Sequence, residues 1–226
     1  MSEGGEWKTC ASLAGGLAGL SVRVGDRGTT YTVAGTPAVH DVIEVGEGTS
    51  VRLRRDARAF FQGNRFLVSR LVREVADRVT SGPVVDLYAG SGLIGLAIAA
   101  RGAAEVTLVE GDPIAARDLE ANAKPYRCAY VVRQSVEAYL AAGGARAADV
   151  VVVDPPRTGL STDAVDHLLR YANPRSIVYV SCDPATLARD AGRLAAARYG
   201  LDSIVALDLF PNTAHVETVA VFSRTV

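Results

Sequence analysis

The stretch "DLYAGSGLIGLAIA", residues 86–99, contains the glycine pattern G-x-G-x-x-G at Gly90, Gly92 and Gly95. It continues a short apolar run typical of a buried strand and leads into a run typical of a helix. Glycines at these positions allow a tight turn and a close approach of the backbone to a ligand. Glu110 ends the next apolar run, and its carboxylate can accept both hydroxyls of a ribose. The stretch therefore predicts the strand, turn and helix of a nucleotide-binding α/β fold.

From residue 83 onwards, apolar runs alternate with helical segments. The strand candidates are "VVDLY", "EVTLVE", "AYVVR", "DVVVVD" and "SIVYVS". Helices of about ten to fifteen residues are expected to begin near Gly92, Pro113, Ser135, Ser161 and Pro184. Continuous apolar strands joined by helices indicate a parallel sheet that is covered on both faces.

Two more strand candidates, "DSIVALDLF" and "VETVAVFSR", close the chain. Only about six residues join them, too few for a helical crossover, so the last strand is expected to run antiparallel. Ligands of an open α/β sheet bind beyond the carboxyl ends of its parallel strands. Asp154 and Cys182 end the fourth and fifth strands, and Glu217 begins the antiparallel one. The topology therefore predicts that these three residues share one site.

The 226-residue composition, with 49% hydrophobic and 22% charged residues, is that of a globular protein. No apolar run approaches the roughly 18 residues of a membrane span. The stretch "CASLAGGLAGL" follows Glu3, Glu6 and a single Lys8, the wrong charge for a signal peptide, so we expect a cytoplasmic protein. The three Cys and three His are dispersed, which predicts no metal site.

The formal net charge of −1 excludes a globally basic nucleic-acid binder but allows a local basic patch. Residues 51–73 contain seven Arg against Asp56 alone, which fits either phosphate contacts or a solvated face. Within this region, apolar residues recur at helical spacing in "NRFLVSRLVREVADRV", and Asn64 is the expected N-cap.

Two features favour S-adenosylmethionine over a nicotinamide dinucleotide. Asp86 precedes the glycines, and a carboxylate suits a sulfonium and an amino group better than a pyrophosphate. The motif "DPPR" at 154–157 follows the fourth strand, where nucleic-acid methyltransferases carry an acidic residue followed by two prolines. A dehydrogenase would also need a substrate domain, which this sequence lacks.

The chain resembles the RNA 5-methyluridine methyltransferases, which methylate C5 of uridine in tRNA or 23S rRNA with S-adenosylmethionine. The matching motifs occur in the family's order and cover about residues 55–226: "FFQGN" (60–64), "DLYAGSG" (86–92), "VEGD" (109–112), "DPPRTGL" (154–160), "SCDPATLARD" (181–190) and "FPNTAHVE" (210–217). The resemblance implies a class I methyltransferase with a Rossmann-like sheet. It assigns residues 63–226 to the methyltransferase domain and residues 1–62 to a small β-rich segment.

The resemblance also implies roles for individual residues. Cys182 corresponds to the family's nucleophile and Glu217 to its general base. The cofactor contacts it implies are Gln62, Tyr88, Glu110 and Asp154. Where the family usually has Asn after the cysteine, this chain has Asp183, whose charge would raise the pKa of the thiol unless Arg157 or a helix amino end offsets it.

The chemistry of the reaction requires such residues. C5 of uracil is a poor nucleophile until a thiolate adds to C6, and the C5 proton then needs a base. Cys182 and Glu217 meet these needs, and Arg157 could stabilise the thiolate or the enolate. The target base must leave its stack to reach them.

Three alternatives remain open. One is an RNA cytosine-C5 methyltransferase, although those enzymes usually carry a further cysteine after the fourth strand and "DPPR" has none. Another is a non-catalytic protein that binds only the cofactor or RNA, because the family's N-terminal RNA-binding β-barrel has no counterpart here. The last and weakest is a dinucleotide dehydrogenase.

Overall fold

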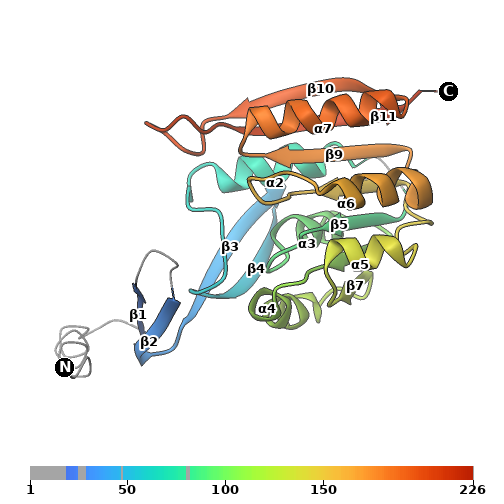
Figure 1. The fold of residues 1–226 in the computed structure, drawn as a ribbon. Coiled ribbons are helices and arrows are strands. Elements are labelled where there is room, and N and C mark those ends of the chain that lie inside the picture. The colour runs from blue at the N-terminus through green and yellow to red at the C-terminus, as the bar shows by residue number, and fades with distance from the viewer. Residues whose placement is uncertain (1–18, 25–28, 47, 80–81, 226) are drawn as a thin grey trace.

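The fold is described from a computed structural model for residues 19–24, 29–46, 48–79 and 82–225. Its centre is a seven-stranded sheet with the order β10-β11-β9-β8-β5-β6-β7 (Figure 1). The strands are β5 (Val84–Leu87), β6 (Val106–Val109), β7 (Ala129–Val132), β8 (Val150–Val153), β9 (Ser176–Ser181), β10 (Tyr199–Leu207) and β11 (Glu217–Arg224).

The strands β5 to β9 pair in parallel, and β11 runs antiparallel to both β9 and β10. The predicted reversal of the last strand is therefore confirmed. The connection is longer than expected, residues 208–216, because β10 ends at Leu207, but it still contains no helix. This topology is that of a Rossmann-like class I methyltransferase sheet.

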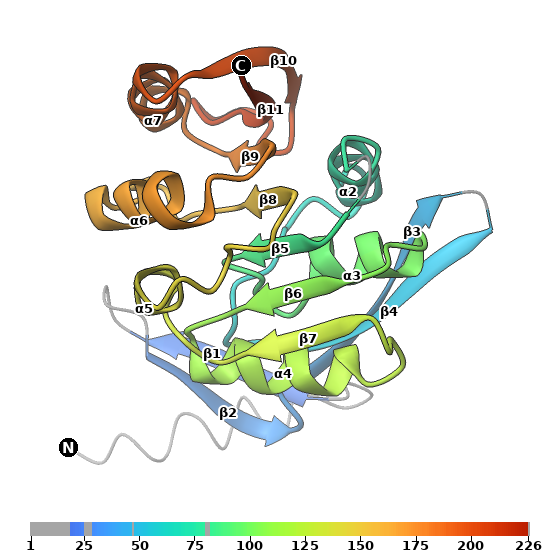
Figure 2. The ribbon, with the colours of Figure 1, turned by 90° about the vertical axis from the view of Figure 1, so that its right-hand side faces the viewer.

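Helices cover both faces of the sheet (Figure 2). On one side lie α2 (Val68–Ala76), α3 (Leu93–Ala100) and α4 (Pro113–Ala123). On the other lie α5 (Val136–Ala141), α6 (Thr162–His167) with the π-helical turn η1 (Leu168–Ala172), and α7 (Pro184–Ala196). The side chains of four N-cap residues accept hydrogen bonds from the first turns, which explains why the helix starts were predictable: Asp112, Ser135, Ser161 and Asp183. The helices α5 and α6 are shorter than expected, with six residues each.

The apolar strands are buried because both faces are covered. All four valines of β8 are fully buried, and they alternate between two core clusters, one beneath each layer of helices. This burial is why the strands are continuously apolar in sequence.

The helix α2 begins later than predicted. Its first residue is Val68, and Asn64 does not cap it. The side chain of Asn64 instead accepts from the N–H groups of Phe66 and Leu67 and donates to the carbonyl of Leu209 at 3.1 Å. Asn64 therefore holds the turn that precedes the helix and joins it to the segment after β10.

The amino-terminal part forms two antiparallel pairs, β1 (Gly19–Val24) with β2 (Thr29–Gly35) and β3 (Ala38–Gly46) with β4 (Thr49–Asp56). The long hairpin β3–β4 packs against α2, α3 and α4. Four of its residues join the core beneath those helices: Ile43, Val45, Val51 and Leu53. The hairpin therefore completes this face of the molecule.

None of the helices in the described ranges is long and apolar enough to cross a membrane. The apolar stretch "CASLAGGLAGL" lies almost entirely outside the described residues, as do Cys10 and the charged residues that argued against a signal peptide.

Candidate active site

Five residues lie along the carboxyl edge of the parallel strands. Tyr88, Glu110, Asp154 and Cys182 directly follow β5, β6, β8 and β9, and Glu217 begins β11. Because these five strands are neighbours in the sheet, the residues lie along one edge. The structure thus places Asp154, Cys182 and Glu217 at one edge, as the topology predicted, whereas the roles of all five residues stay predictions.

The carboxylate of Glu217 affects the ionisation of the Cys182 thiol. Burial raises the pKa of the Cys182 thiol, and the charge of Glu217 raises it further, whereas Arg157 lowers it. Glu217 is only 1% exposed, and neither of its carboxylate oxygens has a hydrogen-bond partner among the described residues. Burial, followed by the charge of Asp154, raises the pKa of Glu217 to about 8.

Asp86, which is buried, and Asp154, which is half-buried, add two more carboxyl groups. Burial raises the pKa of Asp154 to about 7, and burial together with the charge of Asp154 raises that of Asp86 to about 8. One oxygen of Asp86 accepts from the N–H of Gly95 at 2.8 Å, and the other has no partner among the described residues. Buried carboxylates without partners are costly unless a proton or a cation neutralises them. The edge of the sheet is therefore suited to a positively charged ligand.

The glycine-rich turn is held by Glu110. Its carboxylate accepts from the N–H groups of Gly90 at 2.7 Å and Asp112 at 2.6 Å. Each oxygen still has a free lone pair for a ribose hydroxyl. Gly90 and Gly92 have φ angles of 56° and 99°, and a Cβ at Gly90 would meet nothing within 4 Å. Open space beside a glycine turn and a carboxylate fits a nucleoside.

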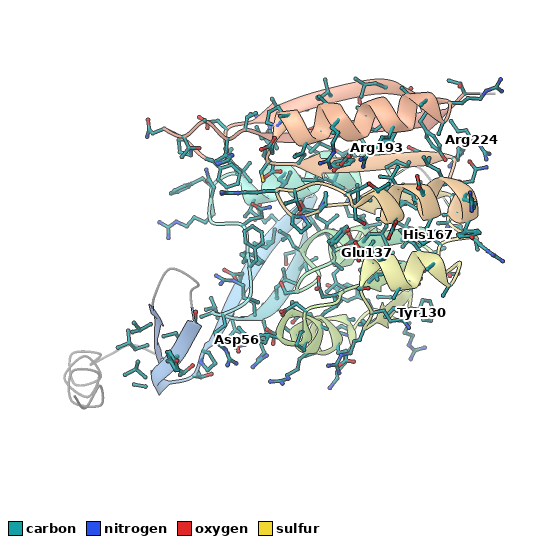
Figure 3. The ribbon with its side chains drawn as sticks, in the orientation of Figure 1. Asp56, Tyr130, Glu137, His167, Arg193 and Arg224 are labelled. Carbon is teal, nitrogen blue, oxygen red and sulfur yellow. The ribbon has the colours of Figure 1, made fainter. Side chains whose placement is uncertain are left out.

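Tyr88 has a constrained position. Its φ of 64° lies in the left-handed region, which is uncommon for a bulky residue. Burial raises the pKa of its hydroxyl, and the nearby charge of Glu137 raises it further. Glu137, on α5, accepts from the hydroxyl of Ser161, the N-cap of α6, at 3.0 Å (Figure 3). Tyr88 therefore stays un-ionised at neutral pH.

Gln62 lines a cavity of about 790 Å³ together with Arg55, Arg58, Arg65 and Phe60. It is 8% exposed, and its side-chain oxygen has no partner among the described residues. Cys182 and Glu217 are not among the residues that line this cavity. An unpaired amide oxygen at the wall of a cavity is suited to receive a donor from a ligand.

Asp183 is not among the groups that raise the pKa of the Cys182 thiol, although its position beside the cysteine suggested that it would be. Its carboxylate caps α7 by accepting from the N–H groups of Ala185 at 2.9 Å and Thr186 at 3.0 Å, and these bonds lower its pKa. The rise in the pKa of Cys182 comes from burial and from Glu217.

Three buried polar residues with structural contacts to the site were missed in the sequence. Asp190 is fully buried and accepts from Leu160 N–H at 2.9 Å and from the Tyr179 hydroxyl at 2.8 Å, so it ties α7 to the loop that carries Arg157. Asp118 and Asn122, both on α4, bind β4. Their i, i+4 spacing on a helix with a buried face was the one available signal.

Comparison with known proteins places the fold in a family. A family model described as "Conserved hypothetical protein 95" matches residues 70–201. The chain belongs to this family.

Homologues of this member of the Conserved hypothetical protein 95 family are RNA methyltransferases. An uncharacterized RNA methyltransferase of Lactobacillus johnsonii is 36% identical over 206 residues, covering 86% of this chain and 43% of that protein. The tRNA (uracil(54)-C(5))-methyltransferase of Pyrococcus horikoshii is 38% identical over 162 residues, covering 72% of this chain and 38% of that protein. The chain thus spans less than half the length of these curated relatives.

A solved structure confirms the predicted class I methyltransferase fold. The tRNA (uracil-54, C5)-methyltransferase of Pyrococcus abyssi, in complex with S-adenosyl-L-homocysteine, superposes with a TM-score of 0.69 at 32% identity. The match covers 86% of this chain and 45% of that one.

Proposed function

We propose that this protein transfers a methyl group from S-adenosylmethionine to C5 of uridine in RNA, through a covalent bond between Cys182 and C6 of the base. The observation that carries the proposal is the position of Cys182 and the buried Glu217 at the same edge of the neighbouring strands β9 and β11, next to the paired residues Ser181 and Thr218. Homology to tRNA (uracil(54)-C(5))-methyltransferases supports the target atom.

The cofactor would lie along the edge from β6 to β8. Glu110 would accept the ribose hydroxyls, and the turn at Gly90 and Gly92 gives the nucleoside room. Asp86 and Asp154 would face the positive charges, with Tyr88 and Gln62 as further contacts. When bound, S-adenosylmethionine supplies a methyl group on a positively charged sulfur. The solved relative with S-adenosyl-L-homocysteine supports this assignment.

The chain's own residues carry the remaining steps. The thiolate of Cys182 forms a bond to C6, and the electron pair of the C5–C6 double bond moves to C5. C5 would then bond to the methyl carbon, and the bond between that carbon and the sulfur would break with its electron pair left on the sulfur. Glu217, in its ionised form, then removes the C5 proton, the double bond forms again, and the C6–S bond breaks to return the thiolate. The raised pKa of Glu217 makes this form more abundant as pH rises towards about 8. Arg157 favours the thiolate because its charge lowers the pKa of Cys182.

The basic segment 51–73 offers less free charge than its composition indicated. Four of its seven arginines pair with carboxylates: Arg54, Arg55, Arg58 and Arg70. Arg52, Arg65 and Arg73 are exposed and have no carboxylate partner among the described residues. Arg65 lies over the ring of the exposed Phe66, with 5.0 Å between its guanidinium carbon and the ring centroid. Arginine beside an exposed aromatic ring suits an RNA strand with unstacked bases.

The competing interpretations are less well supported. The described cysteines are Cys128, which packs at the edge of the core, and Cys182, so no second thiol follows β8 as in RNA cytosine-C5 enzymes. A protein that only binds its ligands would have no need for an unpaired buried Glu217 beside a thiol.

The decisive experiment uses RNA that carries 5-fluorouridine, with S-adenosylmethionine, and either the wild type or Cys182→Ala. A base can remove the hydrogen at C5 as a proton but cannot remove fluorine in this way. The reaction therefore stalls as an adduct that survives denaturation. Wild type and the control Cys128→Ala should form the adduct, and Cys182→Ala should not. Parallel tRNA and 23S rRNA transcripts identify the substrate. Cofactor binding without an adduct on either RNA would overturn the proposal.

A further inference from the structure

Asn122 joins two parts of the molecule that are far apart in sequence. It lies on α4 and is 7% exposed. Its side-chain oxygen accepts from the N–H of Arg54 at 2.9 Å, and its side-chain nitrogen donates to the carbonyl of Arg54 at 2.8 Å and to that of Ser91 at 2.9 Å. One amide thus binds both the strand β4 and the glycine-rich turn.

Asp118, one turn earlier on α4, binds the end of the same strand. It is 1% exposed and accepts from the Arg54 guanidinium and from the N–H of Asp56 at 2.5 Å. Asp56, which lies beside α4 in Figure 3, in turn accepts from the backbone N–H and from Nε of Arg58, each at 2.9 Å. These contacts fix the point at which the chain leaves β4 towards Gln62.

The amino end of α4 is attached to Glu110, the residue expected to bind the ribose. Asp112 caps the helix and donates its N–H to Glu110, and Glu110 accepts from Gly90. The helix therefore contacts the Glu110 carboxylate, the glycine-rich turn and the strand that leads to Gln62.

We infer that Asn122 is a positioning residue for S-adenosylmethionine. Asn122 holds the glycine-rich turn at a fixed distance from β4 and so makes the hairpin β3–β4 part of the cofactor site. The inference rests on the proposed function. Among side chains of this size, only an amide offers one acceptor and two donors, which is what one N–H and two carbonyls demand. An apolar residue would leave all three buried groups unpaired, and the turn would move to find other partners.

The test measures S-adenosyl-L-homocysteine binding by calorimetry, at a temperature at which every variant is folded. Asn122→Leu is expected to weaken binding about tenfold or more, because the turn loses its anchor. Its affinity for RNA should be unchanged, because Asn122 hydrogen-bonds only backbone groups, and none of the exposed arginines Arg52, Arg65 and Arg73 is among its partners. Leu194→Ala, a buried change near the far end of α7, is the matched control. It should lower the melting temperature without changing the affinity for S-adenosyl-L-homocysteine.

If Asn122→Leu does not fold, Asn122→Ala replaces it, because the smaller side chain leaves room for water to reach the carbonyls. A lower melting temperature with wild-type affinity for S-adenosyl-L-homocysteine in either variant would show that Asn122 only supports the fold, and would overturn the inference. A wild type that binds no S-adenosyl-L-homocysteine would instead refute the proposed function.

Discussion

Replacing Glu217 by Gln should stabilise the protein without its ligands at alkaline pH. Folding raises the pKa of Glu217 from 4.5 to about 8. Between these two values the folded state binds the proton more tightly than the unfolded state, so stability falls as pH rises through the window. Gln resembles the protonated side chain in shape and carries no charge, so the variant escapes this loss.

The magnitude follows from the size of the shift. At 1.36 kcal/mol per pKa unit, full ionisation of Glu217 costs at most about 5 kcal/mol. Structural relaxation and water entry reduce this cost, so we expect Glu217→Gln to gain about 2 kcal/mol more at pH 8.5 than at pH 5.5.

Urea denaturation of the protein without its ligands, at both pH values, measures the free energy of unfolding. The control is Glu105→Gln, which changes an exposed carboxylate and should give no pH-dependent gain. An equal free-energy difference between Glu217→Gln and wild type at pH 5.5 and pH 8.5 would refute the argument that Glu217 is buried without a partner.

Three further predictions concern other parts of the site. In a variant without the other cysteines, the rate at which iodoacetamide alkylates Cys182 should rise only at alkaline pH. Arg157→Ala should move the midpoint of this pH dependence upward, because Arg157 lowers the pKa of the thiol. An unmoved midpoint would contradict this. Asp190→Asn should cost about 3 kcal/mol in urea denaturation, because Asn cannot replace a buried carboxylate shared by Arg189, Tyr179 and the Leu160 N–H; a loss within 0.5 kcal/mol, roughly the range of surface changes, would count against the network. Arg65→Ala should reduce the slope of log affinity for RNA against log salt by about 1, whereas Arg146→Ala, which contacts Tyr171 instead, should leave the slope unchanged.

The order of strands and helices could be predicted because each signal is local. Ser135 and Ser161 cap the helices they precede, and the valines of β8 are buried on both faces. The antiparallel strand followed from a connection too short for a helix, and it was this inference that brought Glu217 to the site.

The contacts of the charged residues could not be predicted, because their partners come from distant parts of the chain. Arg54 counts as a free positive charge in the sequence, yet it pairs with Asp118 on α4. Asn64 has the sequence context of an N-cap, but its amide reaches the carbonyl of Leu209. A local pattern contains no information about such long-range partners.

The place of β11 between β9 and β10 affects the order in which the protein can assemble during synthesis. The thiol of Cys182 emerges from the ribosome before Glu217, and β9 and β10 have to leave a gap that only the later strand fills. A nascent chain that has made β10 therefore exposes two unpaired strand edges, which are prone to aggregation. It also carries the Cys182 thiol without Glu217, the base that we propose for it. Neither the sheet nor the proposed catalytic pair is complete until β11 has been inserted, so in the proposed mechanism the thiol gains its base only when folding is nearly finished.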